Sequence, residues 1–416
     1  MKTRAVRMYG KEDLRLEEFD LPEIKEDEIL AEIVSDSICM SSWKAAEQGT
    51  EHKRVPKDIA ERPVIIGHEF CGRLLQVGAK WAHKFRPGQK FAIQPALNYK
   101  GSLFSPGYSY QYIGGAATHI VIPNEVMEMG CLLDYNGDAF YFGSVAEPMS
   151  CIVGTYHAMY HTENGKYEHK MGIVEGGNMA ILAGAGPMGM GALDYAVHND
   201  RKPGLLVVTD IDDARLNRTA SIYTPEEAAK HGVKLVYLNT AENAVEKLMA
   251  LTGGKGYDDV LVMAPVRPVV EQGDAILGRD GCLNFFAGPT DTAFSGLINY
   301  YNVHYNSAHV MGTTGGNTND MIESLRLTEK KLINPAVMVT HIGGLNSVAK
   351  ATLALPEIPG GKKLIYTGIT MDLTAIDDFA VLGKTNQQFA KLAEITNRSK
   401  GLWSTEAEKY LLAHWH

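Results

Sequence analysis

The sequence predicts an α/β protein in which a doubly wound parallel sheet is joined to an antiparallel β domain and followed by a helical tail. Three observations lead to this fold class. Short strand-like segments separated by glycine and proline fill roughly the first 125 residues. From about residue 178, short apolar runs alternate with helix-like segments. From about residue 373 to the end, the pattern is helical.

The length and composition are those of a globular protein with more than one domain. The chain has 416 residues, of which 45% are hydrophobic and 21% are charged. A chain of this length is expected to form roughly two or three domains. The net charge of −9 argues against non-specific binding to nucleic acid, and we expect no nucleic-acid partner.

The cysteines and the first residues favour a reducing compartment. The five cysteines are odd in number, scattered, and never spaced as C-x-x-C, which is atypical of a disulfide framework. The opening residues "MKTRAVRMYG" lack the apolar core of a signal peptide. We therefore expect a cytoplasmic protein.

The strands of the N-terminal region are predicted from their alternation of apolar and polar residues. The segments are "TRAVRMY", "LRLEEFD", "EILAEIVSDS", "EFCGRLLQVG", "QKFAIQP" and "ATHIVIP". Period-2 alternation is typical of strands buried on one face. Because long helical patterns are scarce here, we predict an antiparallel β domain.

The middle of the chain has a different rhythm. Its short apolar runs are "MAILAG", "LLVVTD", "KLVYLN", "DVLVMA" and "CLNFFAG", each followed by a helix-like stretch. Apolar runs of this kind are typical of parallel strands that are buried on both faces. They predict a series of βαβ units.

The last hundred residues return to mixed and then helical patterns. "TNDMIESLRLTEKKL" is predicted to be helical and precedes "PAVMVTHIGGL" and "KKLIYTG". Beyond Leu373, "DDFAVLGKTNQQFAKLAEITN" and "STEAEKYLLAHW" are predicted helices. Ser404, with Glu408 nearby, makes a helix start that is not a strict capping box.

A glycine-rich turn, "ILAGAGPMGMG", predicts a dinucleotide site. It follows the predicted strand 179–183 and opens a predicted helix, with Pro187 in the first turn. The glycines of G-x-G-x-x-G let the backbone approach a pyrophosphate, and the helix N-terminus offers free N–H groups. The alternative is a tight turn without a ligand. The expected cofactor-binding residues here are Gly184, Gly186, Pro187, Met188 and Gly189.

Two further positions concern the same cofactor. Asp210 ends the next strand, about twenty residues beyond the motif, where a carboxylate bonds a ribose 2′-hydroxyl and repels a 2′-phosphate. We therefore expect NAD(H) in preference to NADP(H), although Arg215 and Arg218 lie close in sequence and leave NADP(H) open. Ala287 and Gly288, after "CLNFF", are expected near the cofactor because small residues allow close approach. An ordinary strand-end turn is the alternative.

The stretch 179–197 also has a membrane interpretation. It is apolar except for Asp194 and is long enough to span a bilayer. The glycine motif explains it better, and we expect no membrane partner.

Two titratable residues, His68 and Glu69, stand inside the apolar run "IIGHEFCG". Buried polar groups need partners or serve a site. With Cys39 and Glu147 they offer the ligand types of zinc, and three protein ligands with an open fourth position is the catalytic arrangement. The spacing alone leaves other interpretations open: Cys39 as a small buried side chain, His68 as a core histidine, and Glu147 as a helix-start residue.

The segments "GHEFCGRLLQVG", "AEPMSC" and "ILAGAGPMGMGALDYA" resemble motifs of the zinc-containing medium-chain alcohol and polyol dehydrogenases, over roughly residues 3–368. The resemblance implies a GroES-like, barrel-like domain that carries a catalytic zinc and a Rossmann domain that carries a nicotinamide cofactor. By position, Cys39, His68 and Glu147 match the zinc ligands. Glu69 matches the adjacent glutamate that tunes or replaces a ligand, and Ser41 matches the hydroxyl group that relays a proton from the substrate.

The resemblance also implies domain limits. Residues 1–153 and 317–416 are expected to form the GroES-like catalytic domain with its C-terminal helical extension. Residues 154–316 are expected to form the Rossmann domain. Relatives are commonly dimers or tetramers, so we expect a homo-oligomer.

A narrower resemblance concerns the substrate. "TRAVRMYGKEDLRLEEFDLP", "CMSSWKAAEQG", "HVMGTTGGNTNDM" and "GGKKLIYTG" resemble the L-sorbose 1-phosphate reductases. This group implies a zinc-dependent oxidoreductase that reduces L-sorbose 1-phosphate to D-glucitol 6-phosphate. The alternatives are a zinc dehydrogenase of an unphosphorylated polyol, an amino alcohol or a simple alcohol, and a non-catalytic dinucleotide-binding protein.

The chain departs from the family at two places. Many relatives hold a structural zinc on four closely spaced cysteines, and no cysteine lies between Phe91 and Thr118 here. We therefore expect one catalytic zinc ion and no structural zinc. Ser42 stands where many relatives carry an aspartate that supports the ligand histidine, which is a change expected to affect metal affinity.

A substrate phosphate needs cationic or N–H partners. The sequence offers Lys44, Lys362, Lys363 and His304 without choosing among them. The segment "PGYSYQYIGGAATH" has the aromatic and glycine residues of a sugar pocket, and a packed barrel loop explains it equally well.

Overall fold

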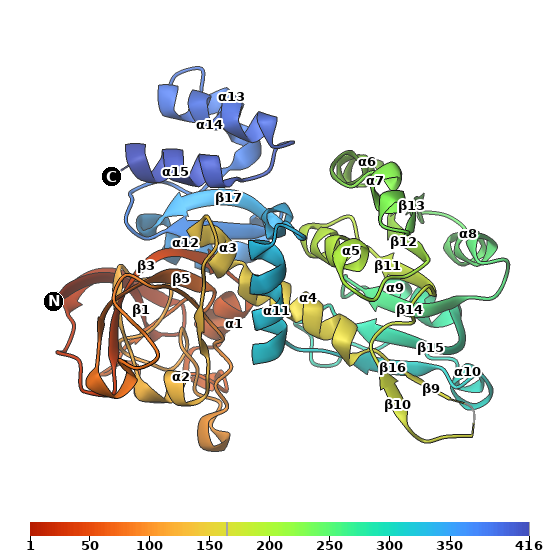
Figure 1. The fold of residues 1–416 in the computed structure, drawn as a ribbon, viewed down its shortest axis with the longest axis horizontal. Coiled ribbons are helices and arrows are strands. Elements are labelled where there is room, and N and C mark those ends of the chain that lie inside the picture. The colour runs from red at the N-terminus through yellow and green to blue at the C-terminus, as the bar shows by residue number, and fades with distance from the viewer. Residues whose placement is uncertain (164, 416) are drawn as a thin grey trace. The chain divides into compact units, whose positions relative to one another are not determined.

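The computed structural model describes residues 1–163 and 165–415. These residues form two compact units. The first consists of residues 1–148, 317–330 and 335–416, and the second of residues 149–316 and 331–334. Helix α4 (Ala146–Ala158) carries the chain from the first unit into the second (Figure 1). The domain limits expected from the sequence stay a prediction.

The first unit contains an antiparallel β structure in two sheets. Its strands are β1 (Lys2–Gly10), β2 (Asp13–Asp20), β3 (Ile29–Ile38), β4 (Val64–Ile65), β5 (Phe70–Val77), β6 (Lys90–Ile93), β7 (His119–Ile122), β8 (Leu132–Asp134), β17 (Val339–Gly344), β18 (Lys362–Tyr366) and β19 (Thr374–Ala375). The larger sheet has the order β19-β17-β18-β3-β5-β6-β8, with β7 also paired to β3. The smaller has the order β2-β1-β4. All six strands predicted from alternation occur, and β17 and β18 form a parallel pair within the otherwise antiparallel sheet.

Strand β3 shows why the sequence folds this way. Ile29, Ala31 and Ile33 alternate inward into the barrel core, whereas residues 35–38 at the end of the strand are all buried. The end of β3 is covered on both faces, so polar side chains placed there must find partners inside the protein. Cys39 follows directly.

Several helices join these strands. They are α1 (Met40–Gln48), α2 (Asn124–Glu128), α3 (Phe140–Ser144), α11 (Thr318–Glu329) and α12 (Val348–Leu353). Helix α11 begins with a full capping box, in which Asn317 and Asp320 bond each other's backbone N–H groups. The predicted helix at this place is therefore confirmed.

The second unit is a doubly wound parallel sheet. Its strands are β11 (Asn178–Leu182), β12 (Leu205–Asp210), β13 (Lys234–Asn239), β14 (Tyr257–Val262), β15 (Leu277–Phe285) and β16 (His309–Gly312). They lie in the order β13-β12-β11-β14-β15-β16, all parallel. The order reverses between β11 and β14, which is the switch point where a Rossmann sheet binds its ligand.

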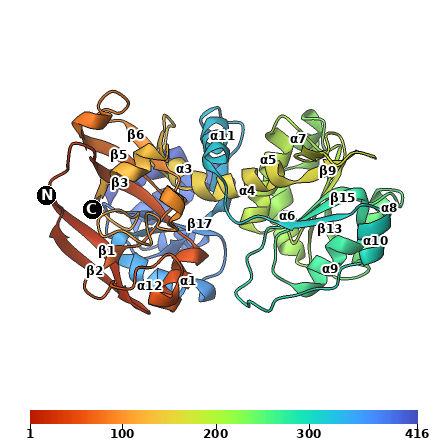
Figure 2. The same cartoon turned by 90° about the horizontal axis from the view of Figure 1, so that it is seen from below.

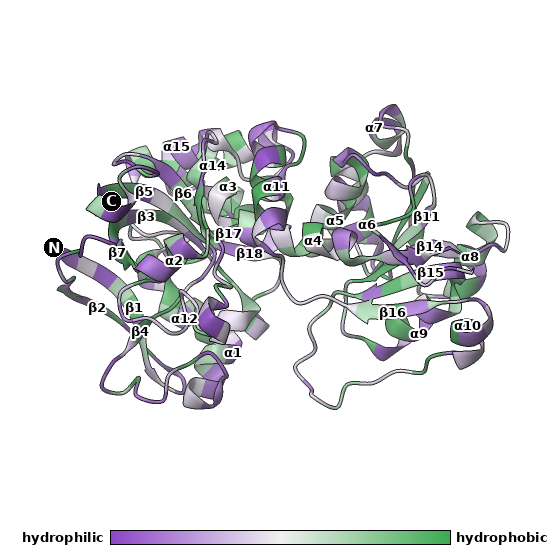
Figure 3. Cartoon of the chain, turned by 60° about the horizontal axis from the view of Figure 1, so that its bottom comes forward, coloured by the Kyte–Doolittle hydropathy of each residue, from purple (hydrophilic) through white to green (hydrophobic). Residues whose placement is uncertain are grey.

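Helices lie on both faces of this sheet (Figures 1 and 2). They are α5 (Pro187–His198), α6 (Asp213–Ile222), α7 (Pro225–Lys230), α8 (Ala244–Leu251), α9 (Arg267–Ala275) and α10 (Tyr300–Tyr305). A short hairpin of β9 (Tyr160–Thr162) and β10 (His169–Met171) completes the unit. Figure 3 shows hydrophobic residues along β11 and hydrophilic residues on α6 and α7. The five apolar runs predicted to be parallel strands are confirmed.

The helical tail consists of α13 (Phe379–Leu382), α14 (Gln387–Arg398) and α15 (Thr405–His414) (Figure 1). Ser404 caps α15 by accepting a hydrogen bond from the N–H of Ala407, so the predicted helix start is confirmed. Glu408 also lies in the first turn of α15, but its side-chain hydrogen bonds go to another helix. Its buried carboxylate accepts hydrogen bonds from the N–H groups of Phe140 and Tyr141 at the start of α3.

Residues 179–197 form strand β11, a turn and helix α5. Within the described residues, no helix combines the length and the apolar character needed to cross a bilayer.

Candidate functional site

Two neighbouring strands bring Cys39, His68 and Glu69 together. Cys39 follows β3 and is the N-cap residue of α1, while His68 and Glu69 lie between β4 and β5. Strands β3 and β5 pair so that the N–H of Ser37 donates to the carbonyl oxygen of Glu69. The end of one strand therefore meets the start of the other, across a sequence distance that no local pattern encodes.

Gly67 makes the turn into this segment possible. Its φ of +90° is favourable for glycine, and a Cβ atom there would lie 2.4 Å from Oδ2 of Asp36 and 2.8 Å from the N atom of Ala116. A larger residue would move His68 away from the strand end. The glycine in "IIGHEFCG" therefore has a geometric reason.

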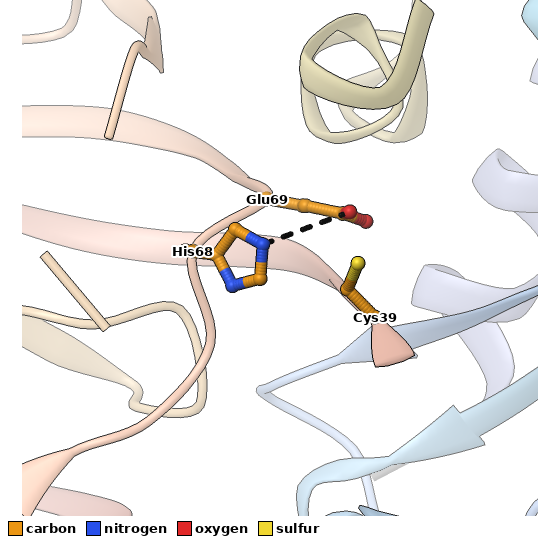
Figure 4. A group of neighbouring side chains, drawn as sticks. All are labelled: Cys39, His68 and Glu69. Carbon is orange, nitrogen blue, oxygen red and sulfur yellow. Dashed lines mark ion pairs between the residues drawn. The ribbon is translucent and has the colours of Figure 1, made fainter. Parts of the chain in front are cut away.

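The three side chains form a group that can hold a metal ion. One potential ligand atom from each lies within 4.8 Å of the others, and Figure 4 shows the three side chains converging. His68 Nε2 is 3.9 Å from Oε1 of Glu69. His68 is 4% exposed and Glu69 is 0% exposed, so neither is a solvated surface residue.

Hydroxyl groups surround the imidazole of His68. Ser42 Oγ lies 3.3 Å from Nδ1. Ser41 Oγ lies 3.2 Å from Nε2 and donates to Cys39 Sγ at 3.1 Å. Ser42 therefore faces the Nδ1 side of the ring, where the sequence had predicted a lost partner, and the ring turns Nε2 toward Ser41 and Glu69.

Tyr108 is a site residue that the sequence did not single out. Its buried hydroxyl donates to Ser41 Oγ at 2.9 Å and lies 3.3 Å from His68 Nε2. It belongs to the stretch "PGYSYQYIGG", for which a sugar pocket and a packed loop were equally good explanations. No spacing in the sequence distinguishes Tyr108 from Tyr110 or Tyr112.

Glu69 is held by a buried ion pair. Lys362 Nζ donates to Oε1 at 2.5 Å, and Ser37 Oγ donates to Oε2. Burial disfavours the charged carboxylate, but the charges of Lys362 and His68 outweigh this effect and lower the pKa of Glu69. The pKa of Lys362 is raised, because nearby anionic groups outweigh its own burial.

Glu147 lies in the first turn of α4 and is not part of the three-residue group. Burial raises the pKa of Glu147 to about 7, and the charge of Glu69 adds to the effect. The negative charges of Glu69 and Glu147 therefore repel each other. Cys39, His68 and Glu69 therefore form the group. Glu147 lies outside it but interacts electrostatically with all three residues.

The donor set fits zinc. A thiolate, an imidazole and a carboxylate are the ligands that this ion takes in proteins. Burial raises the pKa of the Cys39 thiol, an effect that Lys362 opposes, and a bound cation would further favour the thiolate. Cys39, His68 and a carboxylate from Glu69 or Glu147 are thus the residues that would hold the metal.

The glycine-rich turn of the second unit has the shape of a phosphate cradle. Gly186 is the N-cap of α5, with Pro187 and Met188 in the first turn. A Cβ atom on Gly186 would meet no protein atom within 4 Å, whereas one on Gly189 would lie 2.1 Å from the carbonyl oxygen of Gly184. Gly189 therefore allows the helix to pack closely on the turn, and Gly186 leaves open space for a pyrophosphate.

The other predicted cofactor residues lie at the carboxyl ends of two parallel strands of the same sheet, β12 and β15. Asp210 ends β12 and is buried, and its Oδ1 accepts from the N–H groups of Ile211 and Asp212. Arg215 Nη1 lies 4.0 Å from the same oxygen. Ala287 and Gly288 follow β15 after one intervening residue, Phe286. Because the carboxyl ends of parallel strands share one edge, these residues lie on the same edge as the glycine turn.

The four proposed phosphate partners have different surroundings. Lys363 is buried and donates to the carbonyl oxygens of Ile358, Pro359 and Gly361, so its role is structural. Lys362 pairs with Glu69. Lys44 is half-buried on α1, and His304 is exposed on α10 of the second unit.

Comparison with known proteins identifies the class. Residues 25–130 match the family described as alcohol dehydrogenase GroES-like domain, and residues 187–330 match that described as zinc-binding dehydrogenase. The chain belongs to the zinc-binding medium-chain alcohol and polyol dehydrogenase family. The expected resemblance and fold class are confirmed.

Similar proteins narrow the comparison. The chain is 49% identical to the L-sorbose 1-phosphate reductase of Klebsiella pneumoniae, over 99% of this chain and 98% of the relative. It is 48% identical to the mannitol-1-phosphate 5-dehydrogenase of Aliivibrio fischeri, over 99% of this chain and 97% of the relative. It is also 52% identical to the uncharacterized protein YggP of Escherichia coli, over 100% of this chain and 98% of the relative.

Solved structures agree on the fold. The 2R,3R-butanediol dehydrogenase of Bacillus subtilis has a TM-score of 0.68 at 17% identity, covering 88% of this chain and 100% of its own. A protein from Sinorhizobium meliloti 1021 bound to NADP has the same TM-score at 18% identity, with 88% and 99% coverage. At these identities the likeness shows the fold.

Proposed function

We propose that this protein is a zinc-dependent oxidoreductase that transfers a hydride between a nicotinamide cofactor and a sugar phosphate, reducing L-sorbose 1-phosphate to D-glucitol 6-phosphate. The observation that carries the proposal is the convergence of Cys39, His68 and Glu69 next to Ser41. The 49% sequence identity to an L-sorbose 1-phosphate reductase, over 99% of this chain, supports the choice of substrate.

The protein side chains would divide the work as follows. Cys39, His68 and a carboxylate from Glu147 or Glu69 hold the metal. Bound zinc supplies a Lewis acid for the reacting oxygen, and the nicotinamide supplies or accepts the hydride. The hydroxyl of Ser41 moves the proton to or from that oxygen. Its hydrogen bond with the Tyr108 hydroxyl supports this role, because a relay needs a second group to exchange the proton with.

Glu69 serves as the tuning carboxylate. It is fixed by Lys362 and Ser37, so its charge remains beside the ligands whether or not it coordinates. A fixed carboxylate favours the cationic metal and disfavours excess negative charge on the reacting oxygen. Glu147, whose pKa is raised by burial, gains most from a neighbouring cation.

NAD(H) is the proposed cofactor in preference to NADP(H). The position of Asp210 at the end of β12 supports this preference. Arg215 forms ion pairs with Asp210 and Asp212. The positive charge of Arg215 is therefore already shared with these two carboxylates and is less available to a 2′-phosphate. Replacing Asp210 with serine should shift the ratio of kcat/KM values for NADH and NADPH toward NADPH.

A second substrate has specific support. The mannitol-1-phosphate 5-dehydrogenase matches at nearly the same identity as the reductase. The alternative reaction is the oxidation of D-mannitol 1-phosphate at C5. Both reactions interconvert a hexitol phosphate and a ketose phosphate. They therefore need the same hydride transfer and proton transfer at the proposed metal centre.

A steady-state assay separates these substrates. Oxidation of NADH and of NADPH would be followed with L-sorbose 1-phosphate, D-fructose 6-phosphate, L-sorbose and D-fructose. The proposal expects the highest kcat/KM for L-sorbose 1-phosphate with NADH. A preference for D-fructose 6-phosphate would favour the second substrate, and a preference for free sugars would contradict the phosphate proposal.

Three further properties belong to this proposal. One zinc ion per chain is expected, which metal analysis of the purified protein measures. A dimer or tetramer is expected, which light scattering during size-exclusion chromatography measures. The five cysteines, which form no disulfide, support a cytoplasmic enzyme, and fractionation of cells tests that location.

A further inference from the structure

We infer that Arg54 binds the phosphoryl group of the substrate and that Tyr108 links this anion site to the metal ligands. The inference rests on the proposed function, because it names the part of the site that recognises a phosphorylated substrate. Arg54 was not among the cations that the sequence singled out, and its position becomes visible only in the fold.

Arg54 lies close to the candidate metal centre through one aromatic ring. Its guanidinium carbon is 5.3 Å from the centroid of the Tyr108 ring. The Tyr108 ring is in turn 4.8 Å, centroid to centroid, from the ring of His68. Two ring contacts therefore separate the cation from the imidazole, and the hydroxyl of Tyr108 bonds Ser41 in between.

The backbone around Arg54 is fixed, whereas its charge is not neutralised. Its carbonyl oxygen accepts from Ser109 Oγ at 2.6 Å, and its N–H donates to His52 Nδ1. Nε of Arg54 is buried and has no hydrogen-bond partner among the described residues. Arg7 and Arg62 pair with carboxylates, and no such pair involves Arg54 in the part of the chain that the structure describes.

An unsatisfied donor of this kind points to a ligand. A buried N–H without an acceptor is destabilising, and more so when the group is charged. A guanidinium has five donors in a planar fork that matches phosphate oxygens two at a time. An anion seated on Arg54 would satisfy Nε and neutralise the charge together.

The surrounding charges favour an anion too. His52 stacks on Tyr108, with ring centroids 5.8 Å apart and planes 11° apart. Burial lowers the pKa of His52, and the charges of Arg54, Lys53 and Lys44 lower it further. Three cations therefore act on one half-buried imidazole, which indicates a positive potential on this side of Tyr108.

The neutral His52 ring adds a donor. Because Nδ1 accepts from the backbone N–H of Arg54, the ring proton belongs on Nε2 in the neutral form. The two lysines of β18 that the sequence offered for phosphate are already engaged, Lys362 with Glu69 and Lys363 with carbonyl oxygens. The Arg54 side chain, by contrast, has a buried Nε without an acceptor among the described residues.

The chemistry of the substrate agrees with this position. In a 2-ketose 1-phosphate, the phosphate ester is on the carbon next to the carbonyl group that is reduced. A cation that recognises it must therefore lie near the metal ligands rather than at the far end of a six-carbon chain. Arg54, two ring contacts from His68, meets that requirement.

The test compares phosphorylated and free sugar in three variants. Arg54→Gln removes the charge, Arg54→Lys keeps it without the fork, and Arg62→Gln removes an exposed arginine of the same segment. For Arg54→Gln we expect kcat/KM for L-sorbose 1-phosphate to fall about 10- to 100-fold, mainly through KM, because charge-assisted hydrogen bonds are lost. Activity on L-sorbose should change less than about threefold. Arg62→Gln should match the wild type, and Arg54→Lys should lie between.

A binding measurement keeps this inference separate from the proposed function. Isothermal titration with inorganic phosphate should show saturable binding to the wild type that Arg54→Gln weakens by at least about tenfold. Unchanged phosphate binding, or an equal loss of activity on L-sorbose and its 1-phosphate, would overturn the role of Arg54. If the wild type reduces no sugar phosphate, the proposed function fails, and the titration still decides whether Arg54 holds phosphate. Zinc content and thermal denaturation of each variant show that the fold is retained.

Discussion

The ammonium nitrogen of Lys362 lies 2.5 Å from Oε1 of Glu69, and the side chains are only 11% and 0% exposed. Lys362 begins β18 and Glu69 directly precedes β5. Both strands pair with β3, the strand that leads into Cys39. The ion pair therefore joins the two strands that flank the end of β3, where the candidate metal ligands meet. Because both charged groups are largely buried, each relies on the other for stabilisation of its charge.

Removing one partner of this pair should destabilise the protein more than removing both. Lys362→Met leaves the Glu69 carboxylate buried without its cation, which is expected to lower the free energy of unfolding of the metal-free protein by about 3–5 kcal/mol. The double variant Lys362→Met/Glu69→Gln should recover most of this loss. Urea unfolding measures both. Equal stabilities of the single and double variants would show that the pair is not coupled.

Ser42 should affect metal affinity rather than the fold. Its hydroxyl is the group that faces Nδ1 of His68, and partners of a ligand histidine typically change metal affinity by about 10- to 100-fold. We expect Ser42→Ala to weaken zinc binding by this factor and Ser42→Thr, which keeps the hydroxyl, to preserve it. Competition against a chromophoric chelator gives the affinity. Wild-type affinity in Ser42→Ala would mean that another group orients the ring.

The two glycines of the cofactor turn should fail in different ways. A methyl group on Gly189 would collide with the carbonyl oxygen of Gly184, whereas one on Gly186 would meet open space. We therefore expect Gly189→Ala to lower the melting temperature. Gly186→Ala should keep it and weaken NADH binding by about tenfold. Thermal denaturation and fluorescence titration with NADH distinguish the two. A Gly186→Ala protein with normal affinity would place the pyrophosphate elsewhere.

Glu408 should anchor the helical tail to the rest of the first unit. Its carboxylate accepts from the N–H groups of Phe140 and Tyr141 and from the hydroxyl of Tyr366. Glu408→Ala leaves these buried donors unpaired and opens a cavity, so we expect a loss of about 3–5 kcal/mol of stability. Glu406→Ala, on the exposed side of the same helix, is the matched control and should behave like the wild type. Similar unfolding curves for both variants would refute the anchor.

The sequence predicted those features that depend on nearby residues. The strands of both units follow from alternation and apolar runs, and the turn at Gly184, Gly186 and Gly189 follows from local backbone chemistry. Ser404 was recognised as a helix start for the same reason. Each of these signals is contained within about ten residues.

What the sequence could not show depends on long-range pairing. Lys362 and Glu69 are 293 residues apart and meet only because β18 and β5 flank the same strand. Glu408 lies in the first turn of its own helix, as the sequence predicts, but its carboxylate binds the start of α3, 268 residues upstream, which no local pattern indicates. The positions of Tyr108 and Arg54 beside His68 likewise follow from loop packing, for which no periodicity exists.

The most direct test of the account measures turnover against bound metal. Reduction of L-sorbose 1-phosphate by NADH would be followed on wild-type protein and Cys39→Ala of known zinc content, before and after chelation. The account predicts turnover in proportion to bound zinc, and a loss of at least about a hundredfold in Cys39→Ala. Turnover that survives both chelation and the loss of Cys39 would contradict a metal-dependent centre at Cys39, His68 and their carboxylate neighbour.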